Sequence, residues 1–241
     1  MRALGPLIRV TLQSLLGRRR ILLMLLLVAL PVLVGLAIRL GGGRADAPEI
    51  LDTLVIRTVL PLVALVIGSA ALGSEIEDGT LVYLLVKPVP RWVVALAKMA
   101  VAVGLTLVLT VPPMLVTALL IGTAAGGSLG PSLAFVLAAI AGGAAYASVF
   151  TTLGALTTRA LVVGLAYTLL WEGVLAGLLE GTRFLSIRQA TLGIAASLGG
   201  GDPDVATLEP TVSLVVLVLA VASSFVLATV ALQRFQVRAG D

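Results

Sequence analysis

The sequence predicts an all-α integral membrane protein with six transmembrane helices and both termini in the cytoplasm. Three observations support this fold class. Hydrophobic residues make up 59% of the 241 residues, charged residues only 12%, and mean hydropathy is +1.16, whereas a soluble domain is about half apolar and about a quarter charged. The apolar residues form runs of about 20, the length of a bilayer-spanning helix. The basic residues gather on one side of the predicted topology.

Six apolar runs predict the spans, and the third run is the longest. A straight helix from Pro90 to Ile121 would extend about 48 Å at ~1.5 Å per residue, so its first turns should stand in the cytoplasm. Pro112 and Pro113 should kink its far half, because proline cannot donate a backbone hydrogen bond. The six predicted spans are Ile21–Leu40, Leu54–Gly73, Val93–Ile121, Leu133–Leu156, Ala160–Leu179 and Thr211–Leu232.

Orientation follows from the basic residues. With both termini inside, cytoplasmic segments hold eleven of them and outer segments hold five, as the preference for positive charge on the cytoplasmic side requires. The net charge of +4 therefore indicates membrane orientation and not nucleic-acid binding. The eleven are Arg2, Arg9, Arg18, Arg19, Arg20, Lys87, Arg91, Lys98, Arg159, Arg234 and Arg238, and the five are Arg39, Arg44, Arg57, Arg183 and Arg188.

Residues 1–20 are predicted to form an amphipathic helix in the cytoplasmic interface. Leucine and isoleucine recur there at helical spacing, and Arg2, Arg9, Gln13 and Arg20 share the opposite stripe. A disordered basic tail is the alternative. The apolar run that follows is too long for a signal peptide, and no clear cleavage site closes it.

The longest segment outside the predicted spans is residues 180–210. Its first part is apolar enough to pack but too short to cross the bilayer. We expect one or two short outer helices there, either lying flat or re-entrant, before the sixth span. The sequence GGGDPD at Gly199–Asp204 is typical of a turn that leads into that span.

Several reaction classes are excluded by what the sequence lacks. It contains no cysteine and no histidine, so disulfides, thiolate chemistry and histidine-based catalysis are absent. It contains no G-x-x-x-x-G-K-[ST] motif and so does not hydrolyse nucleotide by the P-loop route. GGGD at Gly199–Asp202 is similar to the signature of intramembrane aspartyl proteases, but no predicted span holds a second aspartate. We therefore expect no catalytic residue, no metal site and no cofactor bound by this chain.

Glu172 is the one carboxylate well inside a predicted span. It lies about 20 Å along a straight helix from Arg159, slightly past the membrane midplane. An ionisable group at that depth is costly and is by default functional, so Glu172 could line a substrate path or exchange a proton. A structural hydrogen bond to a neighbouring helix is the alternative. Gly173 and Gly177 follow at four-residue spacing, which favours close approach of another helix.

A dense group of charges lies between the second and third predicted spans, in residues 74–91. Glu75, Glu77 and Asp78 stand within four residues. Ser74 and Glu77 have the spacing of a capping box for a short helix. Gly79 can then end that helix and allow a sharp change of direction.

The second half of this segment is framed by prolines. Thr80 or Asp78 can cap a second short helix that carries Tyr83, and Pro88 should end it, because the residue before a proline avoids the α region. Pro90 then suits the first turn of the next helix. The predicted product is a compact elbow at the cytoplasmic face, either a well-capped turn or a docking surface. Its basic end holds Lys87 and Arg91.

The sequence E-x-E-D-G-T-L-x-Y-L-L-x-x-P-V-x-R in this elbow resembles the type-2 ABC transporter permease family. The residues that carry the resemblance are Glu75, Glu77, Asp78, Gly79, Thr80, Leu81, Tyr83, Leu84, Leu85, Pro88, Val89 and Arg91, with Lys98 downstream. The family's layout is similar over the whole chain, and residues 169–189 also look like its fifth-span region. In that family the loop after the second span forms a coupling helix that rests in a groove of the ATPase subunit.

The resemblance implies a permease subunit of an ABC exporter in the cell membrane. ATP and Mg²⁺ would bind to a separate cytoplasmic P-loop ATPase, which would contact the elbow at residues 74–91. A homodimer, or a pair with a related permease, would be needed to enclose a substrate path. Two alternatives remain at this point: a secondary carrier or channel that uses Glu172, and a non-transporting scaffold that serves envelope assembly.

Overall fold

The computed structural model describes residues 11–12, 15, 17–41, 46–77, 90–123, 129–175, 180–200 and 208–238, and every regular element in these ranges is helical. Helices are expected of so apolar a chain, because within lipid a helix satisfies its own backbone hydrogen bonds. The long helices are α2 (Arg18–Leu40), α4 (Leu60–Glu77), α6 (Arg91–Gly122), α7 (Leu129–Leu156) and α11 (Pro210–Arg238).

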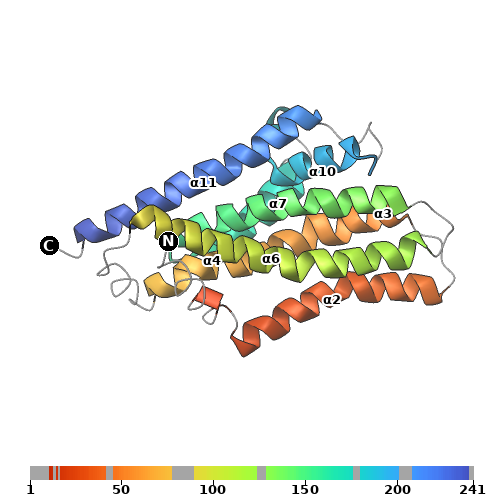
Figure 1. Ribbon diagram of the computed structural model, residues 1–241, viewed down its shortest axis with the longest axis horizontal. Helices are drawn as coiled ribbons and strands as arrows, with labels where there is room; N and C mark the ends of the chain where they lie inside the picture. Colours follow the sequence, from red (N-terminus) through yellow and green to blue (C-terminus); the bar gives the residue numbers. More distant parts are fainter. Residues whose placement is uncertain are drawn as a thin grey trace.

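The long helices lie side by side (Figure 1). Helices α2, α4, α6 and α7 alternate in direction, and α11 runs parallel to α7. At one end of the bundle, α4 and α7 finish and α6 begins; we call it the Arg159 end, after the residue that follows α7. At the other end, α2 and α6 finish and α7 and α11 begin; we call it the Arg188 end. This order agrees with the predicted topology, in which a fifth span lies between α7 and α11. Which end faces the cytoplasm stays a prediction.

Helix α7 is the centre of the bundle, and it packs against α4, α6 and α11. Small residues allow this close packing, as in other membrane helices. A Cβ atom added to Gly154 would stand 2.5 Å from the Ser69 carbonyl oxygen, and one on Gly68 would stand 2.9 Å from Phe150 Cβ. The backbones of α4 and α7 therefore approach each other at distances that only glycine permits. By contrast, α2 and α11 are the least buried of the long helices.

Five helices among the described residues are long and apolar enough to cross a membrane: Ile21–Leu40, Ala47–Ser74, Arg91–Gly122, Leu129–Leu156 and Pro210–Arg234. Four of them match predicted spans to within a few residues. The second begins seven residues before the predicted Leu54, because a short helix α3 (Ala47–Ile50) and a π-helix η1 (Leu51–Val59) precede α4. Helix α6 continues through Pro112 and Pro113 to Gly122.

The predicted fifth span, Ala160–Leu179, is described only as far as Leu175. It begins as α8 (Ala160–Ala166) and continues as a second π-helix, η2 (Tyr167–Leu175). The apolar helix Ala160–Val174 is shorter than the other five, and the count of six spans stays a prediction.

Two short helices occupy the described part of residues 180–210, as the sequence predicted. They are η3 (Glu180–Leu185), a 3₁₀-helix, and α10 (Ile187–Ser197), which packs against α7 and α11 near the Arg188 end (Figure 1). The turn predicted from Gly199 begins with that residue at φ +80, a backbone conformation that suits glycine.

Only a few residues of the predicted interfacial helix, residues 1–20, are described before α2. Thr11, Leu12 and Leu15 are helical, and Leu15 is buried in a cluster with Val63, Ile67 and other residues of α2, α4 and α6. The rest of the prediction lies outside the described residues.

Candidate functional site

The acidic part of the predicted elbow begins on a helix that continues from the membrane span. Helix α4 runs without interruption to Glu77, so Glu75 and Glu77 belong to its last turn. The Ser74 hydroxyl donates a hydrogen bond to the Ala70 carbonyl at 2.7 Å, within the same helix. The predicted capping box at Ser74 is therefore wrong: the serine bonds back to the carbonyl four residues earlier, as serines inside helices do, and does not start a new helix.

The middle of the elbow, residues 78–89, lies outside the described residues. The predicted coupling residues there are Asp78, Gly79, Thr80, Tyr83, Lys87 and Pro88. The chain is described again at Pro90, which precedes α6 and whose carbonyl accepts hydrogen bonds from Val93 N at 3.0 Å and Val94 N at 3.4 Å. Arg91 is the first residue of α6. Both flanks of the elbow thus end at the Arg159 end of the bundle.

Two further residues of α6 lie near the elbow. Trp92 is exposed, as expected of a side chain at a membrane interface. Lys98 is 1% exposed. We expected Lys98 to extend to the interface, but protein surrounds its side chain instead, because α6 is packed against α4, α7 and α11 at this depth.

Glu172 lies in η2 and is 6% exposed. Four donors reach its carboxylate. The Tyr167 hydroxyl donates to Oε1 at 2.8 Å and the Ile187 backbone N–H to Oε1 at 2.9 Å. The Ser186 hydroxyl donates to Oε2 at 2.6 Å and the Arg188 backbone N–H to Oε2 at 3.3 Å. Each carboxylate oxygen is therefore occupied by two donors, which is how a buried charge is tolerated.

Three of these donors belong to the start of α10. Ser186 is the N-cap of that helix, and its hydroxyl also accepts the Gln189 backbone N–H at 3.1 Å. The first N–H groups of a helix have no partner within the helix, and the helix dipole there favours a negative charge. Glu172 satisfies two of these N–H groups and thereby joins the fifth apolar helix to the short helix α10.

A second polar contact holds α10 from another side. The Arg188 guanidinium donates to Asp52 Oδ2 at 3.0 Å and to Oδ1 at 3.4 Å, and both side chains are mostly covered by protein. Asp52 belongs to η1. One turn of α10 thus contacts an acid from each of the two π-helices, η1 and η2, through its cap and its first side chains.

Three aromatic rings, from α7 and η2, pack beside these polar side chains. Tyr146 and Phe150 of α7 stack with ring centroids 6.0 Å apart, and Phe150 meets Tyr167 edge to face at 6.2 Å. Tyr146 is fully buried and lies close enough to Glu172 to interact with it electrostatically. We name Asp52, Tyr146, Tyr167, Glu172, Ser186 and Arg188 together the outer polar cluster.

The glycines that follow Glu172 show no close packing against another helix where they are described. Gly173 is exposed, and a Cβ atom added to it would meet only the Thr168 carbonyl oxygen at 3.5 Å, an ordinary contact. Gly177 lies outside the described residues. Close approach of another helix at these positions stays a prediction, and that helix could belong to a second copy of the chain.

Sequence reasoning found Glu172 but not its partners. One signal was available: Ser186 and Gln189 have the S-x-x-Q spacing of a capping box, which marks the start of α10. Asp52 and Arg188 are 136 residues apart, and no local pattern pairs them. The spacing of five residues between Tyr167 and Glu172 fits one turn of a π-helix, which sequence periodicity does not reveal.

Comparison with known proteins agrees with this architecture. A family model described as ABC-2 family transporter protein matches residues 16–187. No curated protein matches the chain significantly. The matched segment contains the helices from α2 to η3, the whole elbow and most of the outer polar cluster, and it is well over half of the chain. The chain therefore belongs to the ABC-2 family of transporter proteins, as a multi-pass membrane subunit.

Proposed function

We propose that this chain is the permease subunit of an ABC exporter in the cell membrane. A separate P-loop ATPase, which binds ATP and Mg²⁺, drives it, and the elbow at residues 74–91 receives the motion. Substrate then crosses by alternating access, and this chain forms no covalent bond to it. Membership in the ABC-2 family supports the ATPase partner. Eleven of sixteen basic residues on the side of the elbow support its cytoplasmic position.

The position of the elbow is the observation that carries the proposal. It joins α4 and α6, and both of these helices are fixed in the bundle. Helix α4 packs against α7, and α6 packs against α7 and α2. Because both flanks of the elbow lie on packed helices, a push on the elbow would reach the spans through these helices. Glu75, Glu77 and Arg91 stand on these helices, where charge can set the register of a docked partner.

The rest of a transport path requires a second chain. Helices α2 and α11 are the least buried spans and carry many of the exposed large apolar side chains. We propose that a second copy, or a related permease, packs with this chain to enclose the path. The carrier alternative has less support, because four donors within the chain already occupy the Glu172 carboxylate.

Charge reversal in the elbow tests the proposal. Replacement of Glu75, Glu77 and Asp78 by lysine should detach or uncouple the ATPase while the chain still inserts, because like charges would meet across the docked surface. Co-purification with the partner ATPase, and its rate of ATP hydrolysis in proteoliposomes, are the measurements.

Asp46 and Glu49, two exposed acids at the Arg188 end, supply the control. Reversal of these two charges should leave ATPase binding unchanged. If the elbow variant retains normal co-purification and stimulates the ATPase as the unaltered chain does, the coupling role assigned to residues 74–91 is wrong.

A further inference from the structure

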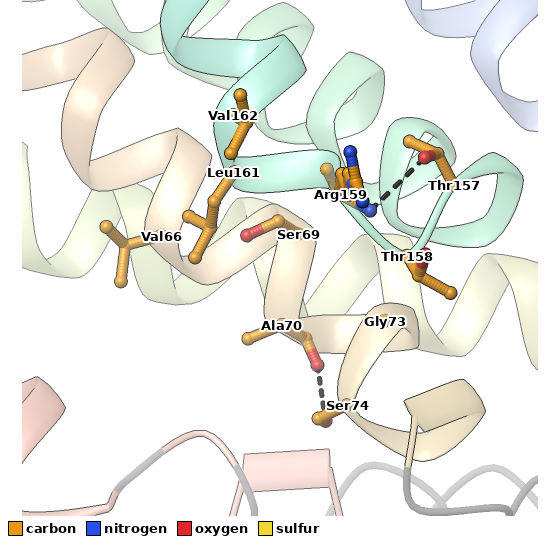
Figure 2. A pocket seen from close by; sticks show the side chains of 11 residues that line it. Val66, Ser69, Ala70, Gly73, Ser74, Thr157, Thr158, Arg159, Leu161 and Val162 are labelled. Carbon is orange, nitrogen blue, oxygen red and sulfur yellow. Dashed lines mark hydrogen bonds between the residues drawn. The ribbon is translucent and has the colours of Figure 1, made fainter.

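A pocket opens at the Arg159 end, between the last turns of α4 and the turn that joins α7 to α8 (Figure 2). Its cavity volume is about 290 Å³. One wall comes from α4, with Val66, Ser69 and Ser74, and the other from residues 157–162. The pocket is separate from the outer polar cluster, which lies toward the Arg188 end.

Arg159 supplies a positive charge at the mouth of this pocket. It is exposed, and it forms no ion pair within the part of the chain that the structure describes. Its backbone N–H donates to the Thr157 hydroxyl at 3.2 Å, which fixes the turn and leaves the guanidinium unengaged. A guanidinium presents a planar set of donors that matches the oxygens of a phosphate.

Hydroxyl groups line the pocket beside this charge. Ser69 is 5% exposed, and its hydroxyl has no hydrogen-bond partner among the described residues. Thr158 is exposed on the opposite wall. The Ser69 hydroxyl lines the pocket and can therefore donate a hydrogen bond to an oxygen of a bound molecule.

The remaining wall is apolar and continues onto the outer surface of the bundle. Val66 lines the pocket from α4, and Leu161 and Val162 of α8 are 50% and 66% exposed. One face of the site therefore suits a phosphate and the adjoining face suits hydrocarbon. A phospholipid has both parts in this order when the pocket lies at the membrane surface.

We propose that this pocket binds the phosphate group of an anionic phospholipid in the leaflet at the Arg159 end. Arg159 contacts the phosphate oxygens, and Ser69 donates its hydroxyl to the headgroup. The acyl chain lies along Leu161 and Val162. The lipid then joins α4, which leads into the elbow, to the α7–α8 turn. This inference does not depend on the proposed transport function.

The test measures which lipid the purified full-length chain retains. Nanodiscs that contain equal amounts of phosphatidylglycerol and phosphatidylcholine are dissolved in mild detergent, and native mass spectrometry counts the lipids that stay bound. The unaltered chain should retain phosphatidylglycerol preferentially. Arg159→Gln should lower that preference about tenfold, because hydrogen bonds to charged groups are among the strongest in proteins. Ser69→Ala should lower it less.

Matched variants separate this site from general attraction to anionic lipid. Arg234→Gln removes an exposed arginine at the same end, on α11, and should change nothing. Thr158→Asp places a carboxylate beside Arg159 in an exposed turn and should abolish the preference without disturbing any packed residue.

Three results would overturn the proposal. Equal loss in Arg234→Gln would show attraction without a site. If inorganic phosphate bound to the chain as well as phosphatidylglycerol does, the pocket would be assigned to a soluble anion. Normal lipid retention in Arg159→Gln, combined with loss of the ATPase on co-purification, would assign Arg159 to a protein interface.

Discussion

Glu172 is the residue where burial and hydrogen bonding decide between a structural role and a transport role. Replacement by glutamine keeps the shape but turns one accepting oxygen into a donating NH₂. Whichever way the amide lies, two of the four donors lose their acceptor. Glu172→Gln should therefore lower the free energy of unfolding by about 1–3 kcal/mol, measured by thermal denaturation in detergent and followed by size-exclusion chromatography.

Two further variants sharpen this result. Glu209→Gln alters an exposed acid near the same end and should leave stability unchanged. A double-mutant cycle with Ser186→Ala should show a coupling of about 0.5–3 kcal/mol, because the two side chains share one hydrogen bond. Loss of transport in Glu172→Gln at unchanged stability would instead place the carboxylate on the substrate path.

At the scale of single residues, the sequence showed which groups are unusual but not what they contact. Glu172 was conspicuous because its charge lies in an apolar run. Its neighbours Ser186 and Ile187 come from a helix that only tertiary packing brings to it. The elbow motif was visible in the sequence as well, whereas Lys98 gave no sign that other helices would cover it.

Among the helical elements, hydrophobic run length predicted α2, α6, α7 and α11 well, because bilayer thickness fixes the length of a span. The start of the second span was missed for a physical reason. Asp52 made the turns before Leu54 look too polar for a span, but Asp52 is paired with Arg188 and so is tolerated there. The π-helical part of the fifth apolar helix was missed because local sequence does not encode that hydrogen-bond pattern.

The packing of α4 against α7 depends on glycine at positions 68 and 154. Gly154→Ala would place a Cβ atom 2.5 Å from the Ser69 carbonyl oxygen, which is backbone and cannot rotate away. The two helices must then separate, and we expect a loss of about 1–3 kcal/mol in the free energy of unfolding. Thermal denaturation of the detergent-purified chain measures it.

Gly104 provides the matched control for this substitution. It lies in the middle of α6, is exposed, and has nothing within 4 Å of an added Cβ atom. Gly104→Ala should leave stability unchanged or raise it by up to ~1 kcal/mol, because alanine is the better helix former. Equal behaviour of the two variants would contradict a glycine-dependent contact between α4 and α7.

At the scale of the whole molecule, the two ends of the bundle carry different structural features. The Arg159 end carries both flanks of the elbow and the Arg159 pocket, and the Arg188 end carries the outer polar cluster that fixes α10 to two other helices. This division is what a transporter needs if a motor acts at one surface and the other must stay closed until it is driven. It assigns a function to each end only if the Arg159 end faces the cytoplasm.

The chain has no cysteine, so single introduced cysteines can test that orientation directly. Thr158 and Glu209 are exposed outside the regular helices at the Arg159 end and the Arg188 end, respectively. In intact cells a membrane-impermeant maleimide should label Glu209→Cys, whereas Thr158→Cys should react only after permeabilisation, because the predicted topology assigns eleven of the sixteen basic residues to the cytoplasmic side. The opposite pattern would put the elbow outside the cell, where no cytoplasmic ATPase could reach it.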